Sequence, residues 1–227
     1  MRTIATFIVC ISLSALPIRS YSQTPQSAPP VPDPGTSPVD SPAPTRYGQL
    51  VDRLKAGDRT VSFTEARTAF TETPAYSGTM MLFYRSLWGA LNMRDFEGAL
   101  KVVDTVLARD YVEPNAHMVA SIAHSQLGHN EEAQLHRFIA DGLLQSITSQ
   151  GDGKTSETAY HVIDVSEEYA LFRALNLTPR SQSAGPPSGG SIVDRMVVVD
   201  PRTNEERVMY FSVDDQTVLR GRASQPR

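Results

Sequence analysis

The sequence predicts an α+β protein in which a helical array comes first and a small, mainly antiparallel sheet follows it. Between 47 and 149 the apolar residues recur at the three- and four-residue spacing of amphipathic helices. After Gly151-Asp152-Gly153-Lys154 this spacing gives way to strand-like alternation in 159–165. Two β-branched runs, 192–199 and 207–213, follow. This change of period predicts two layers that share one core.

Six helices are expected in the first part of this domain, which spans 47–214. The first runs from Tyr47 to Ala56, and Ser62-Phe63-Thr64-Glu65 is a capping-box pattern that opens the second. Pro114 and Gly128 are typical of the start and the end of a helix between them. Four helices are expected within 79–149, with apolar stripes in 81–91, 96–107, 116–127 and 130–149.

Two turns between these helices are alike. Trp88 and Leu91 followed by Asp95-Phe96-Glu97-Gly98-Ala99 resemble the first helix and turn of a tetratricopeptide repeat, and Gly128-His129-Asn130-Glu131-Glu132-Ala133 resembles that turn again. Ala99 and Ala133 are 34 residues apart, which is the period of that repeat. Two repeats are fewer than the three usually needed for stability, so we expect the C-terminal sheet to cover the last helix.

The C-terminal third is expected to hold one helix and three strands. Ser166 to Leu175 is a short helix, and the Ser-, Gly- and Pro-rich stretch 181–191 is expected to be a loop. Asp200-Pro201-Arg202-Thr203-Asn204-Glu205 combines Pro with an Asn that tolerates positive φ, and this favours a hairpin. The hairpin strands and 159–165 would form a three-stranded, mainly antiparallel sheet.

Both ends of the chain are expected to lie outside this domain. A basic start, an apolar run at 4–16 and small residues before Gln23 predict a secretory signal peptide, 1–22, cleaved near Ser22. Eight prolines in 23–46 predict an extended, disordered linker, and 215–227 is expected to be a disordered tail. We therefore expect a periplasmic or secreted protein with no transmembrane segment after cleavage. Its only cysteine, Cys10, is lost with the signal.

Charge and motifs exclude several classes of function. Removal of Arg2 and Arg19 leaves 19 basic and 25 acidic residues, a formal charge of −6, which argues against a nucleic-acid partner. Gly153-Lys154-Thr155 resembles the end of a phosphate-binding loop, but Thr148 stands where that loop needs Gly, and the order of helix and strand is reversed. No cofactor is expected from the sequence, and an enzyme is less expected than a binding protein.

Histidines and carboxylates supply the candidate site. His136 lies on the apolar stripe of the last helix of the array, and His117 lies on the adjoining antiparallel helix. With Glu167 or Glu168 they would form a two-histidine, one-carboxylate metal set, although a structural histidine bonded to backbone or carboxylate is commoner. The candidate ligand-binding residues are His117, His136, Asp152, Lys154, Glu168 and Tyr169, with no catalytic residue assigned.

A set of short motifs extends across the predicted domain. They are His117, His136-Arg137, Gly142-Leu143-Leu144, Ser146-Ile147, Gly151-Asp152-Gly153-Lys154, Tyr160, Val162-Ile163, Glu167-Glu168-Tyr169, Gln182-Ser183 and Tyr210-Phe211. Taken together they resemble an uncharacterised family of exported bacterial proteins, classed as a domain of unknown function, over Phe63 to Val213. The chain departs from the family pattern at Asn204 and at Ala184-Gly185. The resemblance implies no activity, because none is established for that family.

Two functions are consistent with these observations. The first is a non-enzymatic module whose repeat-like helices present a groove to a protein or peptide. The second is a small-molecule or metal site, which would include a hydrolytic one, where the helices meet the sheet.

Overall fold

The computed structural model describes residues 45–76, 81–186, 188 and 192–213. The expected signal peptide (1–22), the tail (215–227) and all of the expected linker except its last two residues lie outside these ranges. Those two residues belong to the domain, because Thr45 caps helix α1 (Arg46–Lys55) by accepting a hydrogen bond from the Gly48 backbone at 3.0 Å. The domain therefore begins slightly earlier than expected.

Helix α2 (Phe63–Thr71) begins where the capping box predicts. The Ser62 hydroxyl accepts from the Glu65 backbone N–H at 3.2 Å, which satisfies one free donor at the helix start. The Glu65 side chain does not return to Ser62, and instead forms an ion pair with Arg46 at 3.0 Å. Helices α1 and α2 pack with α6 around one apolar cluster, and Gly142 of α6 leaves room for the ring of Phe63.

The next four helices agree closely with the predicted stripes. They are α3 (Met81–Asn92), α4 (Phe96–Leu107), α5 (Pro114–Gln126) and α6 (Asn130–Thr148). Asp95 caps α4 through Gly98, Pro114 opens α5, and Gly128 adopts a φ of 81° between α5 and α6. Each helix packs against the next along the chain. That they pair as tetratricopeptide repeats stays a prediction.

In the part of the chain that the structure describes, the sheet has four strands where three were expected. Its order is β1 (Tyr160–Val162), β4 (Glu206–Val213), β3 (Ile192–Val199) and β2 (Thr178–Ala184). Strand β2 begins before the expected loop and takes in residues 181–184 of it, and its exposed, polar side chains explain why no apolar alternation marks it. Strand β1 pairs with β4 in parallel, whereas the other two pairings are antiparallel.

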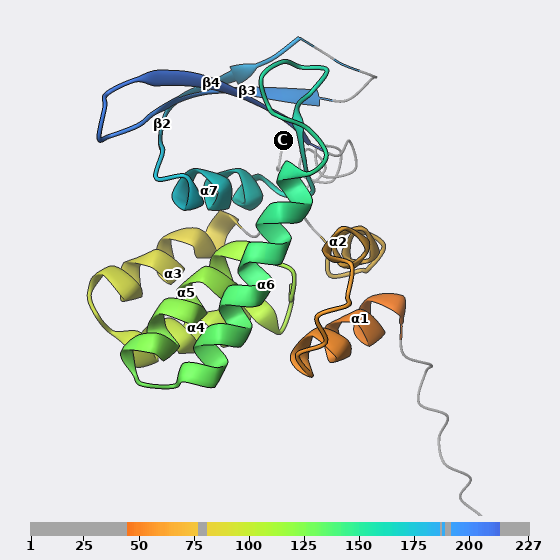
Figure 1. The fold of residues 1–227 in the computed structure, drawn as a ribbon, viewed down its shortest axis with the longest axis vertical. Helices are drawn as coiled ribbons and strands as arrows, with labels where there is room; N and C mark the ends of the chain where they lie inside the picture. The colour runs from red at the N-terminus through yellow and green to blue at the C-terminus, as the bar shows by residue number, and fades with distance from the viewer. Residues whose placement is uncertain (1–44, 77–80, 187, 189–191, 214–227) are drawn as a thin grey trace, which may run out of the picture. The chain divides into compact units, whose positions relative to one another are not determined.

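Helix α7 (Val165–Ala174) lies between the sheet and helices α3 and α5 (Figure 1). Its Leu171 and Phe172 join Phe211 and other residues of the sheet in one apolar cluster. Ile147, near the end of α6, is also part of that cluster. The sheet thus contacts the last helix of the array directly, through β1 and α6, as expected, and α7 provides a second connection between the sheet and the array.

Two turns hold the sheet in place. Asn204 has a φ of 60° in the hairpin that joins β3 and β4, as expected. Gly153 has a φ of 64°, and its carbonyl accepts from the Tyr210 backbone N–H at 2.9 Å, so the loop after α6 is bonded to β4. Among the described residues, no helix combines the length and apolar character that a membrane crossing needs.

Candidate functional site

The first turn of α7 carries three buried polar residues that face three different elements. Ser166 donates to Glu113 at the start of α5, Glu167 binds Arg67 of α2, and Glu168 lies near Asp194 of β3. Successive helical side chains diverge by about 100°, so these three cannot act on one substrate atom. This arrangement connects the helical layers to the sheet.

Arg67 and Glu167 form the central ion pair of this junction. Two guanidinium nitrogens bind the two carboxylate oxygens at 2.7 and 2.6 Å, and both side chains are only 2% exposed. Arg67 also donates to Ser146 and to the His161 carbonyl, while the Ile163 backbone N–H donates to Glu167. All of these partners are protein groups, so this buried arginine is satisfied without a ligand.

Glu113 is a buried acid that pairs with no cation among the described residues. Its carboxylate accepts from the Ser166 hydroxyl at 2.5 Å and from the backbone and side-chain nitrogens of Asn115 at 2.8 and 2.7 Å. Burial raises the pKa of Glu113 to about 7, although these hydrogen bonds oppose the rise. Burial and the nearby Glu113 also raise the pKa of Asp110 well above its usual value.

Glu168, one of the predicted site residues, is fully buried between α7 and the sheet. Burial raises its pKa well above the usual value, and the carboxyls of Asp194 and Asp164 raise it further. No hydrogen bond to either oxygen is formed within the described part of the chain, but Asp194 lies near enough to accept the proton of a neutral Glu168. Glu168 therefore belongs to the sheet interface.

The structure brings His117 and His136 together, as their helices predict. Their Nδ1 atoms are 2.8 Å apart, and Nε2 of His117 is 2.8 Å from the Tyr111 carbonyl. Neither Glu167 nor Glu168 joins them, since these carboxyls face Arg67 and Asp194. Within the described ranges, no three His, Cys, Asp or Glu residues are arranged to hold a metal ion. The proposed set of His117, His136 and Glu168 is thus not assembled.

Asp152 and Lys154 lie together in the exposed loop after α6. Their side chains form an ion pair at 2.8 Å, and Asp152 also accepts from the Lys154 backbone and from the Thr158 hydroxyl. These bonds hold the pKa of Asp152 well below its usual range. The pair stabilises a loop and is separate from the histidines and from Glu168.

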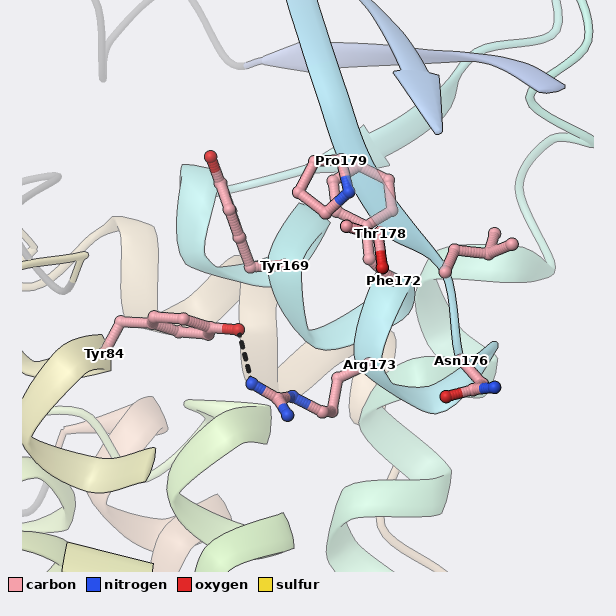
Figure 2. A pocket seen from close by; sticks show the side chains of 8 residues that line it. Tyr84, Tyr169, Phe172, Arg173, Asn176, Thr178 and Pro179 are labelled. Atoms are coloured by element: carbon pink, nitrogen blue, oxygen red, sulfur yellow. Dashed lines mark hydrogen bonds between the residues drawn. The ribbon is translucent and has the colours of Figure 1, made fainter. Parts of the chain in front are cut away.

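Tyr169, the sixth predicted residue, lines a pocket where α3, α7 and β2 meet (Figure 2). The pocket encloses about 370 Å³, which lies within the range of small-ligand sites. Tyr84 of α3 and Tyr169 of α7 are in edge contact, with ring centroids 5.4 Å apart. The remaining lining residues are Phe172, Arg173, Asn176, Leu177, Thr178 and Pro179.

Arg173 is the charged group of this pocket. Its guanidinium lies 4.0 Å from the centroid of the Trp88 ring, and it donates to the Tyr84 hydroxyl at 3.1 Å (Figure 2). No carboxylate among the described residues forms a salt bridge with it. An arginine fixed on aromatic rings with its charge uncompensated is suited to bind an anionic group.

Neither Arg173 nor Tyr84 was predicted from the sequence, and Trp88 was noted only as part of a repeat-like helix and turn. Trp88 is buried, and its ring also forms a cation–π contact with the Arg173 guanidinium. A signal was available, because Tyr169, Phe172 and Arg173 lie at helical spacing on one side of a short helix. Which side faces a pocket depends on the position of α3, and no local pattern gives that position.

Comparison with known proteins places the chain in a family without assigning an activity. No curated protein and no solved structure matches it. A family model described as a domain of unknown function, DUF4919, matches residues 40–219, which include every described residue. The chain therefore belongs to the DUF4919 family.

Proposed function

We propose that this chain is an exported bacterial binding protein, without enzymatic activity, whose partner is a protein or peptide that presents a carboxylate to the α3–α7–β2 pocket. The observation that carries this proposal is Arg173, which is held by Trp88 and Tyr84 and has no described acidic partner. The signal-peptide pattern at 1–22 supports export, and the 34-residue spacing supports repeat-like helices that form the rest of the interaction surface.

The chemistry of the pocket favours recognition over catalysis. Its walls are aromatic rings, a proline, a threonine and an asparagine, with one arginine. Glu113, His117 and Glu168, whose pKa values burial shifts strongly, lie elsewhere, in the α7 junction and the histidine pair. Aromatic walls and a guanidinium fit a carboxylate next to an apolar side chain, as at the C-terminus of a peptide.

A free small molecule is the second candidate, favoured by the size of the pocket. The two are distinguished by whether added peptide length increases affinity. A peptide partner gains contacts beyond the pocket, whereas a small molecule is fully held within it.

The single tryptophan provides the test. Since Trp88 lies directly under Arg173, a ligand that engages the guanidinium changes the tryptophan emission. We expect N-acetylated dipeptides with an aromatic C-terminal residue to change the emission as free acids and not as amides. Arg173→Gln should abolish the change, while Arg85→Gln, an exposed arginine on α3, should retain it. Equal responses to acids and amides, or an unaltered response in Arg173→Gln, would contradict the proposal.

A further inference from the structure

A second cluster of polar groups lies at the far end of the helical array, where α5 turns into α6. It contains His124 in the last turn of α5, His129 just before α6, and His136 further along α6. The rings of His124 and His136 stack, with centroids 5.5 Å apart and planes 13° apart. His117 extends this row of rings into the core.

The hydrogen bonds fix the tautomers of the inner two histidines. The Tyr111 carbonyl only accepts, so Nε2 of His117 carries the hydrogen. Burial lowers the pKa of His117 to about 3, so its Nδ1 is a bare acceptor at neutral pH. Nδ1 of His136 must then donate to it. Burial also lowers the pKa of His136 to about 4, so this ring too is neutral near pH 7.

The outer two histidines share a hydrogen bond between their Nδ1 atoms, and a shift of its hydrogen to Nε2 would free both Nδ1 atoms to bind one ion. Their Nδ1 atoms are 3.2 Å apart. Two nitrogens that each lie about 2.0–2.1 Å from a tetrahedral zinc ion are separated by roughly 3.4 Å. His129 is exposed and His124 is half-buried, so an ion reaches both from solvent.

Carboxylates surround this pair. Glu132 and Asp104 both act electrostatically on His124 and on His136, and both acids are exposed. Glu132 is on α6, three residues after His129, which places it on the same side of the helix. The described donors do not yet form a three-ligand set, so a third ligand requires an exposed side chain to rotate.

We propose that His124 and His129 bind a divalent transition-metal ion, such as zinc, with Glu132 as the third protein ligand. Two neutral imidazoles and a carboxylate are the donors that zinc prefers in the absence of thiolates. His117 and His136 position the site by holding the His124 ring. This site is distinct from the α3–α7–β2 pocket and does not depend on its function.

Zinc titration of the full-length chain, purified without a polyhistidine tag, tests the site. With isothermal calorimetry near neutral pH we expect one zinc ion per chain. His129→Ala should weaken binding at least ~10-fold, a loss that is seen even for outer-shell partners of metal ligands. His129 makes no side-chain capping bond, so this variant should fold. Glu132→Gln should weaken binding as well.

His161→Ala is the matched control, because it removes a histidine that lies on β1, outside the cluster. It should bind zinc like the unaltered chain. Absence of binding overturns the proposal, as does binding that His129→Ala leaves unchanged or that His161→Ala weakens equally. A normal response in Glu132→Gln overturns the assignment of the third ligand. Nitrogen-15 NMR identifies the ligands directly, because zinc binding should change the chemical shift of the unprotonated ring nitrogen of His124 and of His129.

Discussion

Two arginines of this fold contrast in how their charge is compensated. Arg67 is 2% exposed and is bound by both oxygens of Glu167, by Ser146 and by a backbone carbonyl. Arg173 is exposed, rests on Trp88 and has one neutral partner in Tyr84. The first is complete within the protein, whereas the second keeps hydrogen-bonding capacity toward the pocket.

This difference separates structural from functional charge at the same junction. A guanidinium taken out of water must be matched by acceptors of the protein itself, because leaving it unmatched costs several kcal/mol. A guanidinium on aromatic rings at the surface loses little hydration and is free to change partner. The contrast therefore predicts that Arg67 governs stability and that Arg173 governs binding.

Arg67→Ala should have the largest effect on stability. Among the described residues it leaves the buried Glu167 with the Ile163 backbone N–H as its one remaining donor, and breaking a buried pair costs about 3–5 kcal/mol. Urea unfolding of the variant measures this loss. The double variant Arg67→Met, Glu167→Leu should recover part of the stability, since neither charge is then buried. A loss below about 1 kcal/mol in Arg67→Ala would show that the pair is not structural.

The raised pKa of Glu113 should make the free energy of unfolding depend on pH. Its pKa is raised from 4.5 to about 7 in the folded state, so the folded protein holds a proton that the unfolded chain has released between these values. Stability from this group is therefore present at low pH and is lost as the pH rises from 4.5 to 7. The shift corresponds to about 3 kcal/mol.

Comparison with Glu113→Gln isolates this contribution, because glutamine resembles the neutral acid at every pH. Unfolding free energies measured across this pH range should show the unaltered protein losing about 3 kcal/mol relative to the variant. The lowered pKa of His117 reduces stability as the pH falls, which is the opposite trend. Because both proteins contain His117, its contribution cancels when the unfolding free energy of one is subtracted from that of the other. A difference that does not depend on pH would mean that folding does not raise the pKa of Glu113.

Arg173→Gln should change stability by about 1 kcal/mol or less, the value of an exposed cation–π contact. The same variant should lose the carboxylate response of Trp88. Urea unfolding and fluorescence titration on one preparation provide both numbers. A loss comparable to that of Arg67→Ala would remove the distinction between the two arginines.

Lys154→Met is expected to have the smallest effect. Its ammonium pairs with Asp152 in solvent, where screening makes such pairs weak. The urea midpoint should not change measurably. Asp152→Ala should lower the midpoint, because Asp152 also accepts from the Lys154 backbone and from Thr158. Equal effects of the two substitutions would show that the ion pair itself matters.

The helices could be predicted because their boundaries are set by neighbouring residues. The residues that define a helix end lie within a few positions of it, as do Ser62, Asp95, Pro114 and Gly128. Strand β2 could not be found this way, since its side chains are exposed and only pairing with β3 makes it a strand. Edge strands of this kind carry little sequence pattern.

Contacts between predicted residues could be foreseen where those residues lie on consecutive elements of the chain. His117 and His136 lie on consecutive antiparallel helices, and the structure places them in contact. Arg67 and Glu167 are 100 residues apart, and nothing in either segment indicates the other. The pocket around Arg173 likewise depends on how α3 meets α7, which only the assembled core determines.

The parallel pairing of β1 with β4 has a consequence for how the chain is made. Tyr160 faces Phe211, so the first strand of the sheet has its neighbour near the end of the described chain. On the ribosome, the helical array emerges early and forms from local contacts, while β1 waits for the last strand. A nascent chain halted before β4 would thus carry a formed array with an unfinished sheet, and would be a substrate for chaperones or proteases until synthesis ends.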